Sequence, residues 1–225
     1  MRFIERCEVR RRIDGRRIAL VGSGPGVLDN PPGLIDGHDL VVRVNNYKLS
    51  AAAGFRTDVF YSYFGNAVSK SAETLKRDGV TLCLCKCPDA QPIDSDWHRR
   101  NRKTAGIDFR WIYRQRAAFW FCDTYVPAVE EFMAGFNLLG GHVPTTGFAA
   151  LLLLLDCNPA ALTLTGFDFF RSARHNVDQP WRRANPGDPI GHVPERELGW
   201  LAEHRHDYPL RFDPTLCELI FGTAA

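Results

Sequence analysis

The stretch ALVGSGPGVLDNPPGLIDGHDLVVRVNN, residues 19–46, decides the fold class of this chain. A short apolar run ends in a cluster of three glycines, and a second apolar run follows a proline-rich turn. Two such runs are typical of buried strands that lie side by side in a parallel sheet. The glycine spacing is G-x-G-x-G rather than G-x-G-x-x-G, and Pro31 and Pro32 leave no room for the long helix that receives a dinucleotide pyrophosphate.

The glycine turn leaves two interpretations open. A P-loop is excluded because no G-K-[ST] follows. The turn is then either a tight strand–loop connection without a ligand, or a loop whose backbone N–H groups approach one. The second apolar run ends at Asn45, after Arg43, and the carboxyl ends of neighbouring parallel strands share one edge. The pattern therefore favours a mononucleotide cradle to which Asn45 adds its amide.

Strand and helix patterns alternate along the whole chain, which has 225 residues. We predict one α/β domain over residues 1–225, Rossmann-like, with a mostly parallel sheet and helices on both faces. The predicted strands lie within residues 16–24, 38–46, 57–64, 80–87, 107–115, 160–170 and 208–212. The predicted helices lie within residues 65–79, 122–137, 144–159, 194–205 and 214–221.

The charge balance excludes a polycationic nucleic-acid-binding protein, because 28 Lys and Arg face 26 Asp and Glu. Basic charge is concentrated locally in residues 1–17 and 97–116. A solvated surface is the favoured interpretation of both clusters, and a patch for an anionic ligand, glycan or lipid surface is the alternative.

The seven cysteines are interpreted as free thiols in a reducing compartment. Cys83, Cys85 and Cys87 alternate in an apolar run, so we expect buried thiols on one face of a strand. A zinc site would need a fourth ligand nearby, and we expect no metal. The N-terminus has no apolar signal-peptide core, and the longest apolar run is too short to span a bilayer. A cytoplasmic protein is therefore predicted.

Four motifs, in order, resemble those of the sialyltransferases of glycosyltransferase family 29. Residues 19–47 resemble the long motif, an apolar strand with V-G-N-S-G followed by ID-HD-V-R-N. Residues 143–168, VPTTGFAALLLLLDCNPAALTLTGFD, resemble the short motif, P-S-[ST]-G, an apolar helix and YGF. HNVD, residues 175–178, resembles H-Y-Y-[DE], and HVPERE, residues 192–197, fits H-x4-E.

The resemblance implies a variant GT-A-like fold and an inverting, metal-independent transfer of sialic acid from its CMP conjugate to a glycan hydroxyl. No cofactor is implied beyond the CMP-sugar donor. His192 would be the general base, His175 would hydrogen-bond the departing phosphate, and Glu197 would orient the site or cap a helix. The residues implied to bind the donor are Gly22, Ser23, Gly24, Asn45, Thr145, Thr146, Gly147, Gly166 and Phe167.

The chain departs from the family pattern at several positions. Ser23 stands where the family has Asn, the aromatic residues of H-Y-Y-[DE] are missing, and Cys157 has no cysteine partner in the long motif. A bacterial, cytoplasmic enzyme would need neither that disulfide nor the membrane anchor of secretory-pathway members. The expected acceptor is a lipooligosaccharide or capsule glycan, reached by peripheral contact with the anionic inner membrane.

Three alternatives stay open at the level of the sequence. The first is a transferase that uses CMP-Kdo, another CMP-linked 2-keto acid sugar. The second is a pyrophosphokinase-like or other nucleotide-binding protein, and the third is a homologue that binds nucleotide or glycan without transfer. No nucleic-acid partner is expected, and the sequence does not predict the oligomeric state.

Overall fold

Seven parallel strands form one sheet in the computed structural model of the chain, which describes residues 2–64, 70–88, 121–171 and 192–222. The strand order is β5-β4-β3-β2-β1-β6-β7, and every pair is parallel, which confirms the predicted α/β class. The strands are β1 (Arg17–Val21), β2 (Leu40–Val44), β3 (Val59–Ser62), β4 (Leu82–Cys85), β5 (Asp123–Tyr125), β6 (Ala161–Thr165) and β7 (Leu210–Phe212). The helices are α1 (Arg6–Ile13), η1 (Pro25–Asp29), α2 (Ala72–Arg77), α5 (Val129–Leu138), α6 (Thr146–Asp156), α8 (Pro194–Glu203) and α9 (Pro214–Phe221).

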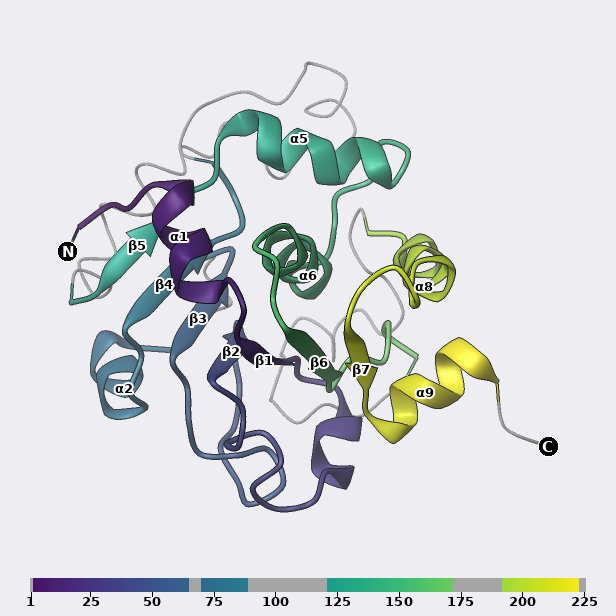
Figure 1. The fold of residues 1–225 in the computed structure, drawn as a ribbon, viewed down its shortest axis with the longest axis horizontal. Helices are drawn as coiled ribbons and strands as arrows, with labels where there is room; N and C mark the ends of the chain where they lie inside the picture. Colours follow the sequence, from purple (N-terminus) through teal and green to yellow (C-terminus); the bar gives the residue numbers. More distant parts are fainter. Residues whose placement is uncertain (1, 65–69, 89–120, 172–191, 223–225) are drawn as a thin grey trace, which may run out of the picture.

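Both faces of the sheet are buried, as a parallel sheet requires. Alternate strand residues face opposite sides, so Val42 and Leu84 join the largest core cluster with α1, α6, α8 and α9. Phe60 and Cys83 face the other side and pack with Leu75 of α2. Figure 1 shows α1 and α6 on one side of the strands and α2 on the other.

The order of the strands reverses between β1 and β6. From β1 the chain moves outward through β2, β3, β4 and β5, and it then returns through α6 to place β6 on the other side of β1. In open α/β sheets the crevice at such a reversal, outside the carboxyl ends of the strands, is where ligands bind. A ligand site is therefore expected at the residues that follow β1 and β6.

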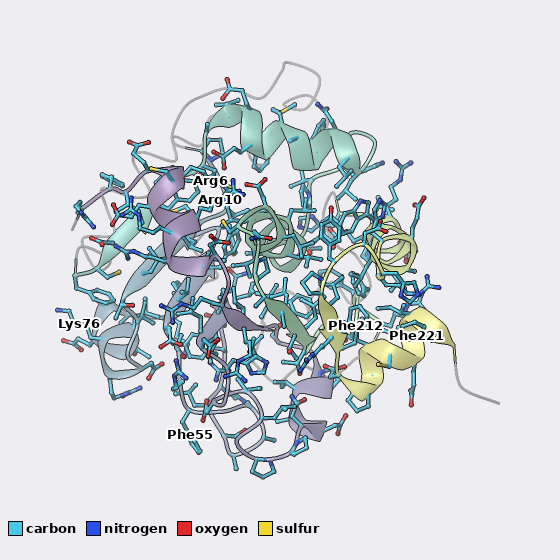
Figure 2. The ribbon with its side chains drawn as sticks, viewed as in Figure 1. Arg6, Arg10, Phe55, Lys76, Phe212 and Phe221 are labelled. Carbon is cyan, nitrogen blue, oxygen red and sulfur yellow. The ribbon has the colours of Figure 1, made fainter. Side chains whose placement is uncertain are left out.

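Several predicted helix ends are confirmed. The apolar segment at 144–159 is α6, and the side chain of Thr145 caps it by accepting a hydrogen bond from Phe148 N at 3.1 Å. Pro194 lies in the first turn of α8, and Gly79 follows α2 with a φ of +89°. The last strand and helix, β7 and α9, are held together by Phe212 and Phe221, which meet edge to face (Figure 2).

The structure differs from the predicted secondary structure at two places, and one predicted strand lies outside the described residues. The helix expected from residue 122 begins only at Val129, because Asp123–Tyr125 pairs with β4 as the edge strand β5. The N-terminal basic cluster contains the unpredicted helix α1. The strand expected at 107–115 lies outside the described residues.

The arginines of the N-terminal cluster largely meet carboxylates. Arg6 contacts Asp156 at 2.6 Å, and Arg2 contacts Asp123 at 3.0 Å, while Arg6 and Arg10 line α1 in Figure 2. This arrangement agrees with a solvated, ion-paired surface. In the described parts of the chain, no helix has the length and apolar character that crossing a bilayer would demand.

Candidate functional site

The glycine turn after β1 lies directly against the turn after β6. Gly22 N donates to Thr165 O at 2.8 Å, and Gly24 N donates to Gly166 O at 2.7 Å. A Cβ atom on Gly22 would lie 2.4 Å from Gly166 O, and one on Gly24 would lie 2.8 Å from the same oxygen. The two glycines are therefore required for a backbone-to-backbone approach, and their N–H groups are already engaged.

A buried carboxylate that the sequence did not single out braces this crevice. Asp213, which is 4% exposed, accepts from Gly166 N at 2.7 Å through one oxygen. Its other oxygen caps α9 by accepting from Leu216 N at 2.8 Å. Asp213 thus fixes the turn after β6 to the start of α9. An Asp before Pro at a helix start was its only sequence signal.

Asn45 projects its amide from the end of β2. Its φ of 50° is in the left-handed region, which asparagine tolerates better than most residues. Ser62, at the end of β3, donates to Asn45 Oδ1 at 2.9 Å and fixes the orientation of the amide. Within the described ranges no acceptor pairs with the amide nitrogen of Asn45, so it is available to a ligand.

The N-terminus of α6 opens at the same edge of the sheet. Thr145 N and Oγ1 are engaged, but no acceptor among the described residues pairs with the N–H groups of Thr146 and Gly147. Such N–H groups, together with the helix dipole, favour an anion. A Cβ on Gly147 would lie 2.3 Å from the Phe167 ring, so this glycine lets the α6 N-terminus approach the turn after β6.

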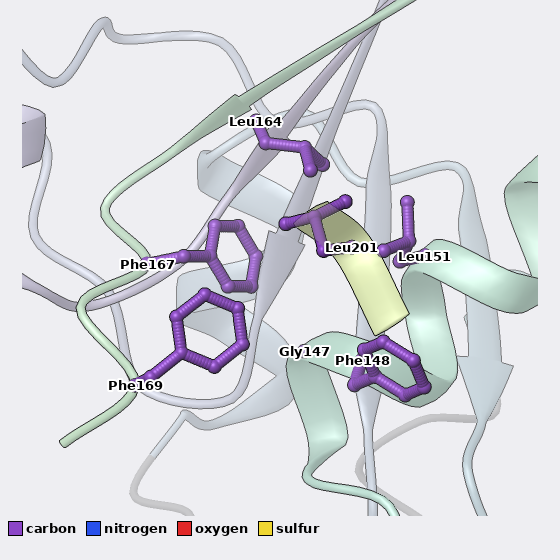
Figure 3. A pocket seen from close by; sticks show the side chains of 7 residues that line it. All are labelled: Gly147, Phe148, Leu151, Leu164, Phe167, Phe169 and Leu201. Atoms are coloured by element: carbon purple, nitrogen blue, oxygen red, sulfur yellow. The ribbon is translucent and has the colours of Figure 1, made fainter. Parts of the chain in front are cut away.

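Phe167 belongs to an apolar wall rather than to a polar subsite. Its ring lies beside Phe169 and Leu201 in a small pocket next to the first turn of α6 (Figure 3). The lining residues are all apolar: Gly147, Phe148, Leu151, Leu164, Phe167, Phe169 and Leu201. This pocket adjoins the crevice but contains no group for acid–base chemistry.

Glu197 is held by the start of α6. It is 1% exposed, and it accepts from Thr145 N at 2.6 Å and from Thr145 Oγ1 at 2.7 Å. Burial raises the pKa of this carboxyl to about 7, against the effect of its hydrogen bonds and of Lys86. Glu197 therefore holds the N-terminus of α6 in place, and its role in catalysis stays a prediction.

One ring nitrogen of His192 is fixed, and the other has no partner among the described residues. Its Nδ1 lies 2.6 Å from Val143 O, and because a carbonyl can only accept, Nδ1 carries the proton. Burial, followed by the positive charge of Lys86, lowers the pKa of His192 to about 3, so the ring is neutral at pH 7. In the ligand-free protein this ring is therefore a weaker base than a free imidazole, and Nε2 is the nitrogen that can accept a proton.

The structure brings most of the predicted site residues to one edge of the sheet. Contacts or close approaches join Gly22 and Gly24 to Gly166, Phe167 to Gly147, and Thr145 to Glu197. Ser23 lies between the two bracing glycines and is partly exposed. His175 lies outside the described residues. No group of three His, Cys, Asp or Glu side chains suited to a metal occurs in the described parts of the chain, and metal independence stays a prediction.

Comparison with known proteins identifies the fold. No protein-family model and no curated protein matches the chain. Among solved structures, a mammalian sialyltransferase bound to a Gal-beta-1-3GalNAc compound matches with a TM-score of 0.55 and 17% identity over 90% of this chain and 71% of that one. The sialyltransferase CstII from Campylobacter jejuni, in complex with cytidine-5'-monophosphate, matches with a TM-score of 0.60 and 14% identity over 94% of this chain and 86% of that one.

The chain has a sialyltransferase-like fold. A third structure, the sialyltransferase CST-II in complex with a trisaccharide acceptor and CMP, matches with a TM-score of 0.56 and 13% identity over 93% of this chain and 86% of that one. At 13% to 17% identity the similarity lies in the path of the chain rather than in the sequence.

Proposed function

We propose that this sialyltransferase-like protein transfers a 2-keto acid sugar, sialic acid, from its CMP conjugate to a glycan hydroxyl, with inversion and without a metal. The observation that carries the proposal is His192, a partly buried neutral imidazole whose Nδ1 is fixed on Val143 and whose Nε2 has no partner among the described residues. It lies in a fold shared with sialyltransferases whose structures hold CMP or an acceptor sugar.

The proposed reaction is a single displacement at the anomeric carbon. The acceptor oxygen forms a bond to that carbon while Nε2 of His192 takes the hydroxyl proton. The bond between the anomeric carbon and the phosphate oxygen breaks on the opposite side, and CMP leaves with the electron pair. Attack opposite to the leaving group inverts the anomeric centre, and no oxidant or reductant is needed.

The donor would lie across the carboxyl ends of the central strands. The turn Gly22–Gly24 and the amide of Asn45 would face ribose and phosphate, and the turn of Gly166 and Phe167 would border the cytidine. The N–H groups of Thr146 and Gly147, which no described residue accepts from, would receive an anionic group, helped by the helix dipole. His175, through its proposed bond to the departing phosphate, completes the set.

The direct test is release of CMP and formation of a glycoside in EDTA. The protein is incubated with CMP-sialic acid or CMP-Kdo and with a lipooligosaccharide or capsule glycan as acceptor. CMP release from CMP-sialic acid without divalent metal is the expected result. Release from CMP-Kdo alone would reassign the donor, and binding of CMP without any release would contradict transfer.

The His192→Ala variant tests the assigned base. Turnover should fall by a factor of about 10² to 10⁴, the usual contribution of a positioned base, while CMP affinity stays within about twofold. His206→Ala removes an exposed imidazole and is the matched control. Unchanged turnover in His192→Ala would remove His192 from the reaction, and loss of CMP binding would assign it to the nucleotide instead.

A further inference from the structure

Lys86 is a buried lysine whose side chain has no partner among the residues that the structure describes. The residue follows β4 directly and is only 7% exposed, while its backbone N donates to Ser62 O at 2.9 Å. In the described parts of the chain, no carboxylate, carbonyl or hydroxyl makes a hydrogen bond or ion pair with its side chain. A lysine buried to this extent is usually paired, because removing its charge from water is costly.

The position of Lys86 follows from the alternation of β4. Leu82 and Leu84 face the core beneath α6, so Lys86, two residues further, continues on that same face just past the strand end. Glu197 and His192 contact Thr145 and Val143 at the start of α6, and the charge of Lys86 lowers the pKa of both, so Lys86 lies near this end of the helix. In the sequence, Lys86 was recognisable as a lysine at the position where the alternation of Leu82 and Leu84 would place an inward-facing apolar residue.

Neither Glu197 nor His192 neutralises this charge by direct contact. Glu197 accepts from Thr145 through both oxygens and acts on Lys86 only at longer range, and His192 is neutral. Lys70 offers a contrast, since this lysine meets Asp78 at 3.7 Å and lies over the ring of Tyr47. Without a partner, the buried charge of Lys86 therefore destabilises the fold, and a bound anion would offset this effect.

We propose that Lys86 is an anion-binding residue of the candidate site and that it receives the carboxylate of the donor's sugar. The inference rests on the proposed function and adds a residue to its site. The carboxylate is favoured over the CMP phosphate because β4 is separated from β1 by β3 and β2. Three strand spacings amount to about 14 Å, so the end of β4 lies farther from the glycine turn after β1 than the end of β2, where Asn45 is proposed to meet the phosphate.

The same contact prepares the base. Burial lowers the pKa of His192 first, and the charge of Lys86 lowers it further. A carboxylate seated on Lys86 offsets that second cause, so the pKa of His192 rises when the donor is bound. Donor binding would in this way make Nε2 more basic at the moment when the acceptor hydroxyl must lose its proton.

The experiment compares two ligands that differ in the sugar. CMP lacks the carboxylate, and CMP-3FNeuAc, a substrate analogue in one CstII structure, carries it. Calorimetric titrations of wild type and Lys86→Met should show CMP-3FNeuAc binding weakened about tenfold or more and CMP binding unchanged. The Lys76→Met control, an exposed lysine on α2 (Figure 2), should change neither affinity.

Stability separates binding from a structural role. Lys86→Met replaces an unpaired buried charge by an apolar chain of similar length, so its melting temperature should equal or exceed that of wild type. If the Met variant does not fold, Lys86→Gln carries the same two-ligand comparison. Equal losses for CMP and CMP-3FNeuAc would move the contact to the phosphate and overturn the carboxylate assignment, as would no loss for either.

Failure of the proposed function has a different signature. If wild type binds neither ligand, the proposed function falls and the assignment of Lys86 falls with it. If wild type binds both ligands and Lys86→Met keeps their ratio of affinities, only the assignment of Lys86 is wrong.

Discussion

At the scale of single residues, the pKa shifts of His192 and Glu197 make the free energy of unfolding depend on pH in opposite directions. His192 is held neutral when folded because burial lowers its pKa from 6.5 to about 3, so its contribution to stability is lost as the pH falls through that interval. Glu197 prefers the protonated form because burial raises its pKa from 4.5 to about 7, so its contribution is lost as the pH rises. In wild type the two effects partly cancel between pH 5 and pH 6.5.

Single substitutions should separate these two effects. In His192→Gln neither the folded nor the unfolded state binds a proton at residue 192. As the pH is lowered from 7 to 5, the free energy of unfolding of the variant should therefore rise by about 2 kcal/mol relative to that of wild type. Glu197→Gln keeps an acceptor for Thr145 N. Its free energy of unfolding should rise relative to that of wild type as the pH is raised from 5 to 7.5. Urea unfolding at each pH measures both.

The exposed His206 provides the control, because His206→Gln should leave the pH profile of wild type unchanged. Parallel pH profiles for wild type and His192→Gln would mean that His192 is not buried in the neutral form.

At the scale of elements, the long periodic segments were predictable and the short or charged ones were not. The strands β1, β2 and β6 and the helix α6 follow from runs of apolar residues that burial on both sides requires. β5 has three residues, too few for an alternation to be visible, and its register comes from pairing with β4. α1 is rich in arginine, and only Val9 and Ile13 form its buried side.

The candidate site was predictable where a motif fixes the local backbone and not where a distant element supplies the partner. The N-cap at Thr145 follows from its own segment, but its second partner, Glu197, is 52 residues away along the chain. Lys86 was not predicted as a site residue, because the alternating cysteines around it indicate a buried strand but not what lies at the end of that strand. Contacts of this kind depend on the order of strands, which the sequence pattern does not determine.

The turn after β1 gives a prediction at this scale. In Gly22→Ala the new Cβ would meet Gly166 O at 2.4 Å, and because both atoms belong to backbone, the two turns must separate. We expect a loss of about 1 to 3 kcal/mol in the free energy of unfolding, measured in urea.

Gly199→Ala is the matched control, since this exposed glycine inside α8 has no atom within 4 Å of the new Cβ. It should gain about 0.5 to 1 kcal/mol from helix propensity. A neutral effect of Gly22→Ala would show that the turns after β1 and β6 can move apart without cost.

At the scale of the whole molecule, the reversal of strand order concentrates the polar groups of distant segments at one edge. The turns after β1, β2, β4 and β6 and the N-terminus of α6 supply glycine backbone, an amide, an ammonium and free N–H groups. Most of these groups suit an anionic nucleotide-sugar better than a neutral ligand. Binding of such a ligand should therefore stabilise the entire fold and not only a local segment.

Cytidine preference is the corresponding prediction for the whole molecule. In EDTA, CMP at 100 times its dissociation constant should stabilise the protein by about 2.7 kcal/mol, and the melting temperature should rise by roughly 5 to 10 °C. UMP and GMP at the same concentration should give clearly smaller shifts. Equal shifts for the three nucleotides, or a shift that appears only with a divalent metal, would contradict a metal-free cytidine site.

A pair of asparagine variants locates that binding. Asn45→Gly keeps the freedom to adopt a positive φ but removes the amide at the end of β2, so the shift produced by CMP should shrink. Asn158→Gly makes the same change at a φ of 58°, at the opposite edge of the sheet before β6, where the side chain contacts Asp14. Its shift should match that of wild type, because the nucleotide would meet only the edge at which β2 ends.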